Sequence, residues 1–275
     1  MAGTLYVVAT PLGNLGDLSP RAADTLKRVS AVAAEDTRHS KPLLNHAGSH
    51  AELVSFHAHS SERALERILR ILSEGRDVAL ITDAGTPAIS DPGVALVAAA
   101  RERGIQVVTI PGPTAVAASL SVSGLGGDRY LFLGFLPRKG SDRRRFLLTV
   151  AQSEWTVVIF ESPNRVMQLL TDLIEVCGPE RQVSVSRELT KVFEETRSGT
   201  LQDLSEHYAE APVRGEVTVV VAGTGKEHVE ERSPDPYERA RDLLAEGLSR
   251  RDVANRLAEE TGISRNTAYR LVNEL

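Results

Sequence analysis

Short apolar runs alternate with segments of helical periodicity through the first half of the chain. Such runs predict buried strands, and apolar residues three or four positions apart predict helices that cover a sheet. Strands are expected over residues 4–9, 31–35, 53–56, 77–82 and 106–110, and helices from Pro20, over 62–72 and over 94–103. This alternation favours an α/β domain with a largely parallel sheet.

A glycine-rich stretch at residues 123–128 (SGLGGD) interrupts the pattern and predicts a hinge or linker. The alternation then resumes, with strands expected over 130–135, 155–160, 182–187 and 217–222, and helices over 141–151, over 164–176 and from Leu201. We therefore expect an N-terminal α/β domain over residues 1–124 and a second α/β domain over residues 125–225. Two such domains are expected to enclose a ligand cleft.

The last part of the chain has a different pattern. Residues 226–236 (KEHVEERSPDP) predict a polar linker, and residues 237–275 predict a small all-α tail of short helices. Segments 251–257 and 264–272, with a turn at Thr261-Gly262, resemble a helix-turn-helix. Because basic and acidic residues nearly balance there, a DNA-reading role and a packing or RNA-docking role both stay open.

Composition narrows the class of protein. The chain has 275 residues, 41% of them hydrophobic, and a net charge of −5. It shows no secretory signal and no apolar stretch long enough to span a bilayer, and its single cysteine, Cys177, fits a reducing compartment. We expect a soluble cytoplasmic protein that does not bind a membrane.

One basic run contrasts with the net negative charge of the chain. Residues 138–145 contain five cations against the single acid Asp142, namely Arg138, Lys139, Arg143, Arg144 and Arg145. Such a run is either a solvated helix face or a surface that binds RNA phosphates.

Three glycine- and proline-containing loops follow strands of the first domain, over residues 10–17, 82–93 and 110–115. The carboxyl ends of strands line the ligand crevice in α/β sheets, and glycine lets a ligand approach the main chain. No G-x-G-x-x-G follows the first strand, so a dinucleotide site is disfavoured. The histidines have no defined carboxylate partner, and no metal site is expected.

Polar clusters follow other strands, over residues 35–38, 161–165 and 187–191. Taken singly, each is typical of a solvated surface. As a set of opposite charges facing one cleft, they are able to position a zwitterionic ligand and a hydroxyl nucleophile.

These residues also carry a resemblance. The motifs ATPLGNL, EDTR, ITDAGTPAISDPG, IPGPTA, FLPRKG, FESPNR, RELTKVFEE and RGE occur in this order between Leu5 and about Gly223. As a set they resemble the tetrapyrrole methylase-like superfamily and, within it, the methyltransferases of small-subunit ribosomal RNA. The helical tail is similar to an extension found on some of its members.

The resemblance implies a two-lobed fold with the cofactor in the cleft, S-adenosylmethionine as methyl donor, and a homodimer. It implies the 2′-hydroxyl of cytidine 1402 in 16S rRNA of the small ribosomal subunit as acceptor. Gly85-Thr86-Pro87 replaces the Gly-Asp-Pro stretch of tetrapyrrole-acting relatives, which weakens the case for a porphyrinoid substrate. Within the closer pattern, Asn164 stands where His is common and Thr114 where Ser is common.

Carried over by position, the resemblance implies a set of cofactor contacts: Pro11, Gly85, Thr86, Pro87, Ile89, Thr114, Ala115, Phe160, Glu161, Glu216 and Val217. We expect the polar rim near the acceptor to consist of Asp36, Arg38, Glu188 and Lys191. A carboxylate or a neutral lysine is able to take the proton of the acceptor hydroxyl, and the sequence does not select between them.

Two other functions stay open at this point. The first is a methyltransferase of a small macrocyclic metabolite. The second is a ligand-sensing regulator that binds DNA through its C-terminal helices.

Overall fold

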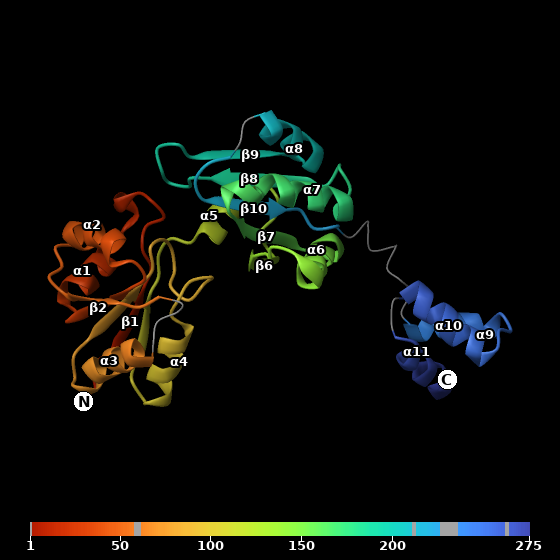
Figure 1. Cartoon of the computed structure of the whole chain (residues 1–275), viewed down its shortest axis with the longest axis horizontal. Helices are drawn as coiled ribbons and strands as arrows, with labels where there is room; N and C mark the ends of the chain where they lie inside the picture. Colours follow the sequence, from red (N-terminus) through yellow and green to blue (C-terminus); the bar gives the residue numbers. More distant parts are fainter. Residues whose placement is uncertain (1, 58–61, 211–212, 226–235, 262–263) are drawn as a thin grey trace. The chain divides into compact units, whose positions relative to one another are not determined.

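The computed structural model describes residues 2–57, 62–210, 213–225, 236–261 and 264–275. The chain folds into two compact units, Met1–Gly223 and Thr224–Leu275. The first unit contains two five-stranded sheets (Figure 1). The predicted linker over 226–236 lies outside the described residues except for Pro236.

The first sheet is entirely parallel, with strand order β3-β2-β4-β1-β5. Its strands are β1 (Leu5–Val8), β2 (Ala31–Ala34), β3 (Glu52–Ser55), β4 (Val78–Ile81) and β5 (Val107–Ile110). β2 and β4 are buried along their whole length because helices cover both faces of the sheet. The prediction of an α/β fold is confirmed for this part of the chain.

Four helices cover this sheet, two on each face (Figure 1). They are α1 (Pro20–Arg28) and α2 (Thr37–Ala47) on one face, and α3 (Glu62–Ser73) and α4 (Val94–Glu102) on the other. Ser19 caps α1 by accepting a hydrogen bond from the N–H of Ala22, as its position before Pro20 predicts. A short 3-10 helix (Leu15–Asp17) precedes α1.

The second sheet is mixed, with strand order β6-β7-β10-β8-β9. Its strands are β6 (Tyr130–Phe135), β7 (Thr156–Glu161), β8 (Gln182–Arg187), β9 (Glu195–Thr200) and β10 (Val217–Val221). Only β6 and β7 pair in parallel among the described strands of this sheet; the others pair antiparallel. β9 was not predicted because its sequence, ETRSGT, lacks an apolar run.

Helices also cover both faces of the second sheet. One face carries α6 (Gly140–Gln152), α7 (Val166–Cys177) and α8 (Leu201–Glu210), with a 3-10 turn (Pro163–Arg165) before α7. The other face carries α5 (Ala115–Ser123), whose Val116 packs with Val158 and Val220. The domain division at residue 124 stays a prediction; α5, which ends just before it, packs on the second sheet.

The second unit contains α9 (Pro236–Ala245), α10 (Arg250–Thr261) and α11 (Arg265–Glu274). These helices share a core of small and branched apolar residues that includes Leu243, Leu257 and Leu271. Ser264 caps α11, while part of the predicted turn at Thr261-Gly262 lies outside the described residues. Among the described helices of both units, none is long and apolar enough to cross a membrane.

Candidate functional site

The loops after β1, β4 and β5 are joined by hydrogen bonds. Thr10 and Gly85 exchange two backbone hydrogen bonds of 2.8 and 3.1 Å, and the Thr10 hydroxyl donates to the carbonyl of Thr82. The Thr86 hydroxyl donates to the carbonyl of Pro113 over 3.2 Å. The second loop is thus fixed between the other two.

These loops form one wall of a cavity of about 440 Å³ inside the first unit, and residues of the second sheet form the opposite wall. The structure brings together most of the residues that the resemblance assigns to the cofactor. Those that line the cavity are Gly85, Thr86, Ile89, Thr114, Ala115, Phe160, Glu161, Glu216 and Val217. Pro11 and Pro87 are buried and do not line it.

Further residues of the lining were not singled out as site residues from the sequence. They include Leu12, Glu35, Asp83, Ser90, Asp91, Phe135, Ser162, Gly215 and Thr218. Several lie inside the motifs that carry the resemblance, such as EDTR, ITDAGTPAISDPG and RGE. The sequence motifs therefore contained these residues, but the fold is needed to show which residue of each motif faces the cavity.

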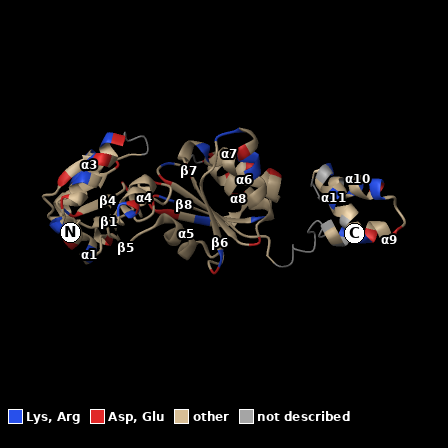
Figure 2. Ribbon diagram, turned by 90° about the horizontal axis from the view of Figure 1, so that it is seen from below, with Lys and Arg blue, Asp and Glu red and all other residues tan. Residues whose placement is uncertain are grey.

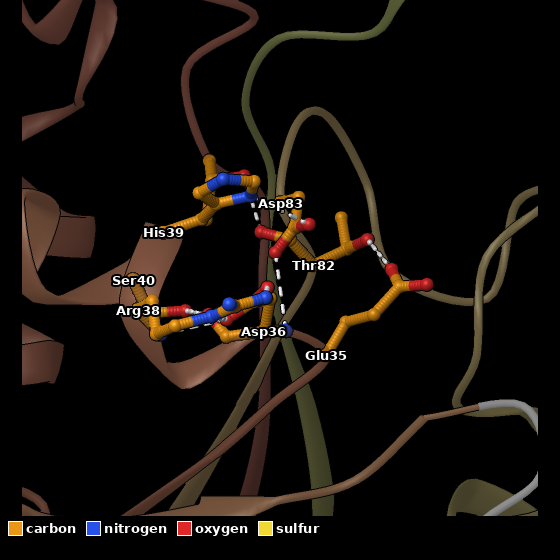
Figure 3. Close-up of polar contacts among 8 residues, drawn as sticks. Glu35, Asp36, Arg38, His39, Ser40, Thr82 and Asp83 are labelled. Atoms are coloured by element: carbon orange, nitrogen blue, oxygen red, sulfur yellow. Dashed lines mark hydrogen bonds and ion pairs between the residues drawn. The ribbon is translucent and has the colours of Figure 1, made fainter.

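Glu35 and Asp83, at the ends of β2 and β4, line the cavity on its acidic side. Figure 3 shows the polar contacts of these two residues. The Thr82 hydroxyl donates to Glu35 Oε2 over 3.2 Å. Asp83 accepts a hydrogen bond from the backbone N–H of Asp36, and its Oδ2 lies 3.3 Å from His39 Nδ1. Each of these two acids therefore has a polar partner outside the cavity.

Asp91 is the half-buried acid of this group, on the loop between β4 and α4. Burial, together with the negative charges of Glu35, Asp83 and Glu216, raises the pKa of Asp91 to about 6; a hydrogen bond with Thr82 opposes the rise. Asp91 is therefore mostly ionised at neutral pH and gains a proton readily just below it.

The predicted rim residues Glu188 and Lys191 do not line the cavity, but Lys191 pairs with Glu216, which does. Lys191 Nζ lies 3.0 Å from Glu188 Oε1 and 3.2 Å from Glu216 Oε2. Burial opposes its charge, but Glu188 and Glu216 outweigh burial and raise the pKa of Lys191. Lys191 is thus a cation at neutral pH, which argues against the neutral-lysine base that the sequence left open.

Glu188 is held in a constrained position. Its backbone has φ of 51°, in the left-handed region, and its Oε1 also accepts the N–H of Glu216 over 3.1 Å. Burial opposes ionisation of Glu188, but the hydrogen bonds from Lys191 and Glu216 outweigh it and lower the pKa of the carboxyl. Glu188 therefore anchors Lys191 and stays ionised.

The other two predicted rim residues lie at the start of α2 (Figure 3). Asp36 caps this helix by accepting the N–H of Arg38, and the Arg38 guanidinium donates to both of its oxygens. These hydrogen bonds hold the pKa of the Asp36 carboxyl well below its usual range. The Arg38 side chain is 85% exposed, and neither residue lines the cavity, so their role near the acceptor stays a prediction.

An aromatic cluster lines the cavity at the ends of β6 and β7. Phe160 packs edge-on against Phe132 and Phe135, with ring centroids 4.8 and 5.7 Å apart. Phe135 and Phe160 face the cavity, and Phe135 is more than half exposed. They provide an apolar surface for an aromatic ring of a ligand.

Glu161 is the most deeply buried acid of the lining, with a side-chain exposure of 0%. Its Oε1 accepts the N–H of Ser162 over 2.8 Å, and its Oε2 pairs with Arg165 over 3.0 Å. This pairing stabilises the charge of a buried carboxylate at the edge of the cavity.

The five cations of the basic run differ in burial: four are exposed and one is buried. Arg138, Lys139, Arg144 and Arg145 are exposed, around and along the start of α6. Arg143 is buried: it pairs with Asp172 over 2.6 Å and donates to the carbonyl of Pro137. Since a phosphate cannot reach a guanidinium that is buried against Asp172, we remove Arg143 from the proposed RNA contacts. Figure 2 shows the distribution of charge over the ribbon.

No group of His, Cys, Asp and Glu able to hold a metal ion occurs among the residues that the structure describes. The arrangement is instead that of a cavity with acidic, aromatic and backbone-lined walls.

The family model of the tetrapyrrole (corrin/porphyrin) methylases matches residues 4–205 of the chain. The chain belongs to this family. A relative from Synechocystis sp., named ribosomal RNA small subunit methyltransferase I, is 44% identical to this family member over 274 residues, which cover 99% of this chain and 98% of the relative. A relative of the same name from Pseudomonas aeruginosa is 45% identical over 270 residues, which cover 98% and 96%.

Solved structures share the fold of this tetrapyrrole methylase family member. Cobalt precorrin-4 methyltransferase aligns with a TM-score of 0.64 and 18% identity, over 80% of this chain and 94% of the other. Uroporphyrin-III C-methyltransferase from Thermus thermophilus, complexed with S-adenosylhomocysteine, aligns with a TM-score of 0.58 and 20% identity, over 80% and 97%. The predicted tetrapyrrole methylase-like fold is confirmed. The chain is a methyltransferase, and the predicted cofactor, S-adenosylmethionine, is confirmed.

Proposed function

We propose that the protein transfers a methyl group from S-adenosylmethionine to the 2′-hydroxyl of cytidine 1402 in 16S rRNA of the small ribosomal subunit. The observation that carries the proposal is the identity of 44–45%, over nearly the full length of both chains, with relatives named for methylation of that RNA. The cytidine and its ribose oxygen come from the resemblance of the motifs.

The cavity fits the methyl donor in charge and shape. S-adenosylmethionine carries a positive sulfonium and an ammonium group, which the carboxylates of Glu35 and Asp83 complement. Phe135 and Phe160 supply an apolar surface for its adenine, and the backbone near Gly85 is open to close contact. When bound there, the donor supplies an activated methyl group.

The protein contributes to the reaction by aligning the reacting atoms and by excluding water from them. Methyl transfer is an in-line displacement, so the rate depends on holding the two reacting atoms close and aligned. The hydrogen-bonded loops that carry Gly85 and Thr114 give a rigid wall, and the apolar ring of Phe160 excludes water. We assign to the Lys191 ammonium, which pairs with Glu188 and Glu216, the role of orienting a polar group near the acceptor.

The exposed cations around α6 are proposed to hold RNA phosphates. These residues are Arg138, Lys139, Arg144 and Arg145. Phosphate contacts position an RNA without reading its sequence, so the choice of cytidine is assigned to the shape of the assembled subunit. We further propose that the enzyme works in the cytoplasm as a homodimer.

A methyltransferase of a macrocyclic metabolite is the second candidate. The solved structures that share the fold are named for such substrates, but at 18–20% identity they support the fold alone. Thr86, which stands where the family resemblance gives an acidic residue for tetrapyrrole-acting relatives, disfavours this function.

Methyl transfer from labelled S-adenosylmethionine to small ribosomal subunits separates these functions. The acceptor is subunits from a strain that lacks the modification, and the control is subunits from a strain that carries it. We expect label only in the unmodified subunits, and a phosphodiester next to cytidine 1402 that resists alkaline hydrolysis. Label on a base, or turnover of uroporphyrinogen without RNA, would reject the proposal.

A further inference from the structure

The acids that line the cavity differ in how their charge is compensated. Most have a donor or cation within contact distance outside the cavity. The pairs are Glu35 with the Thr82 hydroxyl, Asp83 with His39 and the N–H of Asp36, Glu161 with Arg165 and the N–H of Ser162, and Glu216 with Lys191. Each of these carboxylates thus has a donor or a cation that contacts its oxygens.

Asp91 is the exception. The single proton of the Thr82 hydroxyl is donated to Glu35, so within the residues that the structure describes Asp91 has no cationic partner and only shares that hydroxyl. The charged groups that face it are all acidic: Glu35 at the end of β2, Asp83 at the end of β4 and Glu216 at the start of β10. Protonation of the Asp91 carboxylate therefore relieves its repulsion by three neighbouring acids.

The loop around Asp91 also fixes its position. Ser90 before it has φ of 61° and Gly93 after it has φ of 138°, so the main chain turns sharply on both sides. The N–H of Ala88 donates to the carbonyl of Pro92 across the turn. Ser90 lies against Gly134 of β6, where a Cβ would come within 2.8 Å of the serine oxygen. Asp91 is thus held in the cavity wall between the two sheets.

We propose that Asp91 is the general base of the reaction, the group that removes the proton from the acceptor hydroxyl. The inference rests on the proposed function. As the hydroxyl oxygen forms its bond to the methyl carbon, the carbon–sulfur bond breaks and its electron pair stays on sulfur, leaving a neutral thioether. The hydroxyl proton passes to the Asp91 carboxylate, which later releases it to water.

The electrostatics of the cavity agree with this role. A general base works best when its pKa lies near the operating pH, and the pKa of Asp91 is raised to about 6 by burial and by its acidic neighbours. An ordinary aspartate is a much weaker base. Lys191, whose pKa is raised, remains protonated and is excluded from the same task.

The test compares Asp91→Asn with Asp24→Asn, which makes the same change at an exposed position on α1. In single-turnover methylation of small subunits, we expect the wild-type rate to fall below about pH 6 with one ionisation. At pH 7.5, Asp91→Asn should lower the rate at least tenfold, and its pH profile should no longer show the fall below about pH 6. The affinity of this variant for S-adenosylmethionine, measured by calorimetry, should change less than threefold. Formate should restore part of the rate of Asp91→Ala.

A thermal-unfolding series checks the same group without activity. Because the folded-state pKa of Asp91 is raised, its charge costs stability above about pH 6 and costs none below about pH 4. Asp91→Asn should therefore melt higher than the wild type at pH 7.5, and the difference should disappear by pH 4.

Two results overturn the inference while the proposed function stands. One is a wild-type rate and pH profile in Asp91→Asn. The other is a tenfold loss of donor affinity with an unchanged single-turnover rate at saturation, which would make Asp91 a donor-binding group. Wild-type protein that leaves unmodified subunits unlabelled rejects the proposed function instead.

Discussion

At the scale of single residues, the cavity depends on backbone conformations that a side chain disfavours. Gly85 has φ of 84°, its backbone is bonded to Thr10, and a Cβ there would lie 3.4 Å from Leu12. The sequence alone identified this glycine because it lies in a loop after a strand. It did not identify Asp91 as a site residue, because the charges that surround Asp91 come from three separate strands.

Gly85→Ala tests this conformation. We expect about 1 kcal/mol of destabilisation, since an L-residue disfavours the left-handed region, and at least a tenfold loss of affinity for S-adenosylmethionine by calorimetry. The matched control is Gly104→Ala at the end of α4, with φ of 68° and open space around it. The control should lose similar stability and keep the donor affinity; equal losses of affinity in both variants would contradict the assignment.

Arg143 shows the limit of reasoning from charge patterns. A run of cations predicts exposure, yet its place on the inner face of α6 brings Arg143 against Asp172 on α7. Removing one partner of a buried pair leaves the other charge unpaired, so Arg143→Met should lower the free energy of unfolding by about 3 kcal/mol. Urea unfolding measures this, and the double variant Arg143→Met/Asp172→Leu should recover most of the loss. A single variant as stable as the wild type would contradict the pairing.

At the scale of elements, the apolar pattern predicted the strands of the first sheet closely and overlooked α2, α5 and β9. α2 contains Pro42, and α5 carries small or apolar residues on its exposed side as well as its buried side, such as the half-exposed Val122. β9 is a polar edge strand. Periodicity detects elements whose apolar and polar residues lie on opposite faces. α5 and β9 lack this contrast, and α2 has buried leucines only at Leu43 and Leu44, after a polar first turn.

The exposed face of α6 carries its own prediction. Arg144→Ala/Arg145→Ala should weaken binding to small subunits and reduce the slope of log affinity against log salt by about one to two, because each phosphate contact releases counterions. The control Lys27→Ala/Arg28→Ala removes two exposed cations from α1. Filter binding across a salt series measures both, and equal slopes in the two variants would reject the RNA-binding role of α6.

At the scale of the whole molecule, the two units have separate cores. The relatives named for ribosomal RNA methylation align over 98–99% of this chain, so the alignment includes the helical tail. The sequence predicted the tail as a distinct helical segment from its composition. Which surface the tail contacts depends on partners that no pattern in the chain encodes.

A chain ending at Gly225 tests the independence of the first unit. Since none of the described residues of the tail belongs to a core cluster of the first unit, the shortened protein should keep the donor affinity of the full chain within threefold. The full chain should give no discrete footprint on duplex DNA. Loss of donor binding on truncation would show that the tail completes the site, and a tail-dependent footprint would support the DNA-binding regulator.

The most direct test of the central claim is a crystal structure of the protein with S-adenosylhomocysteine. Our account predicts the nucleoside in the cavity, with its sulfur between the loop of Gly85 and Thr86 and the aromatic side of Phe160. Density for the ligand elsewhere on the protein, or none in that cavity at saturating concentration, would contradict the account.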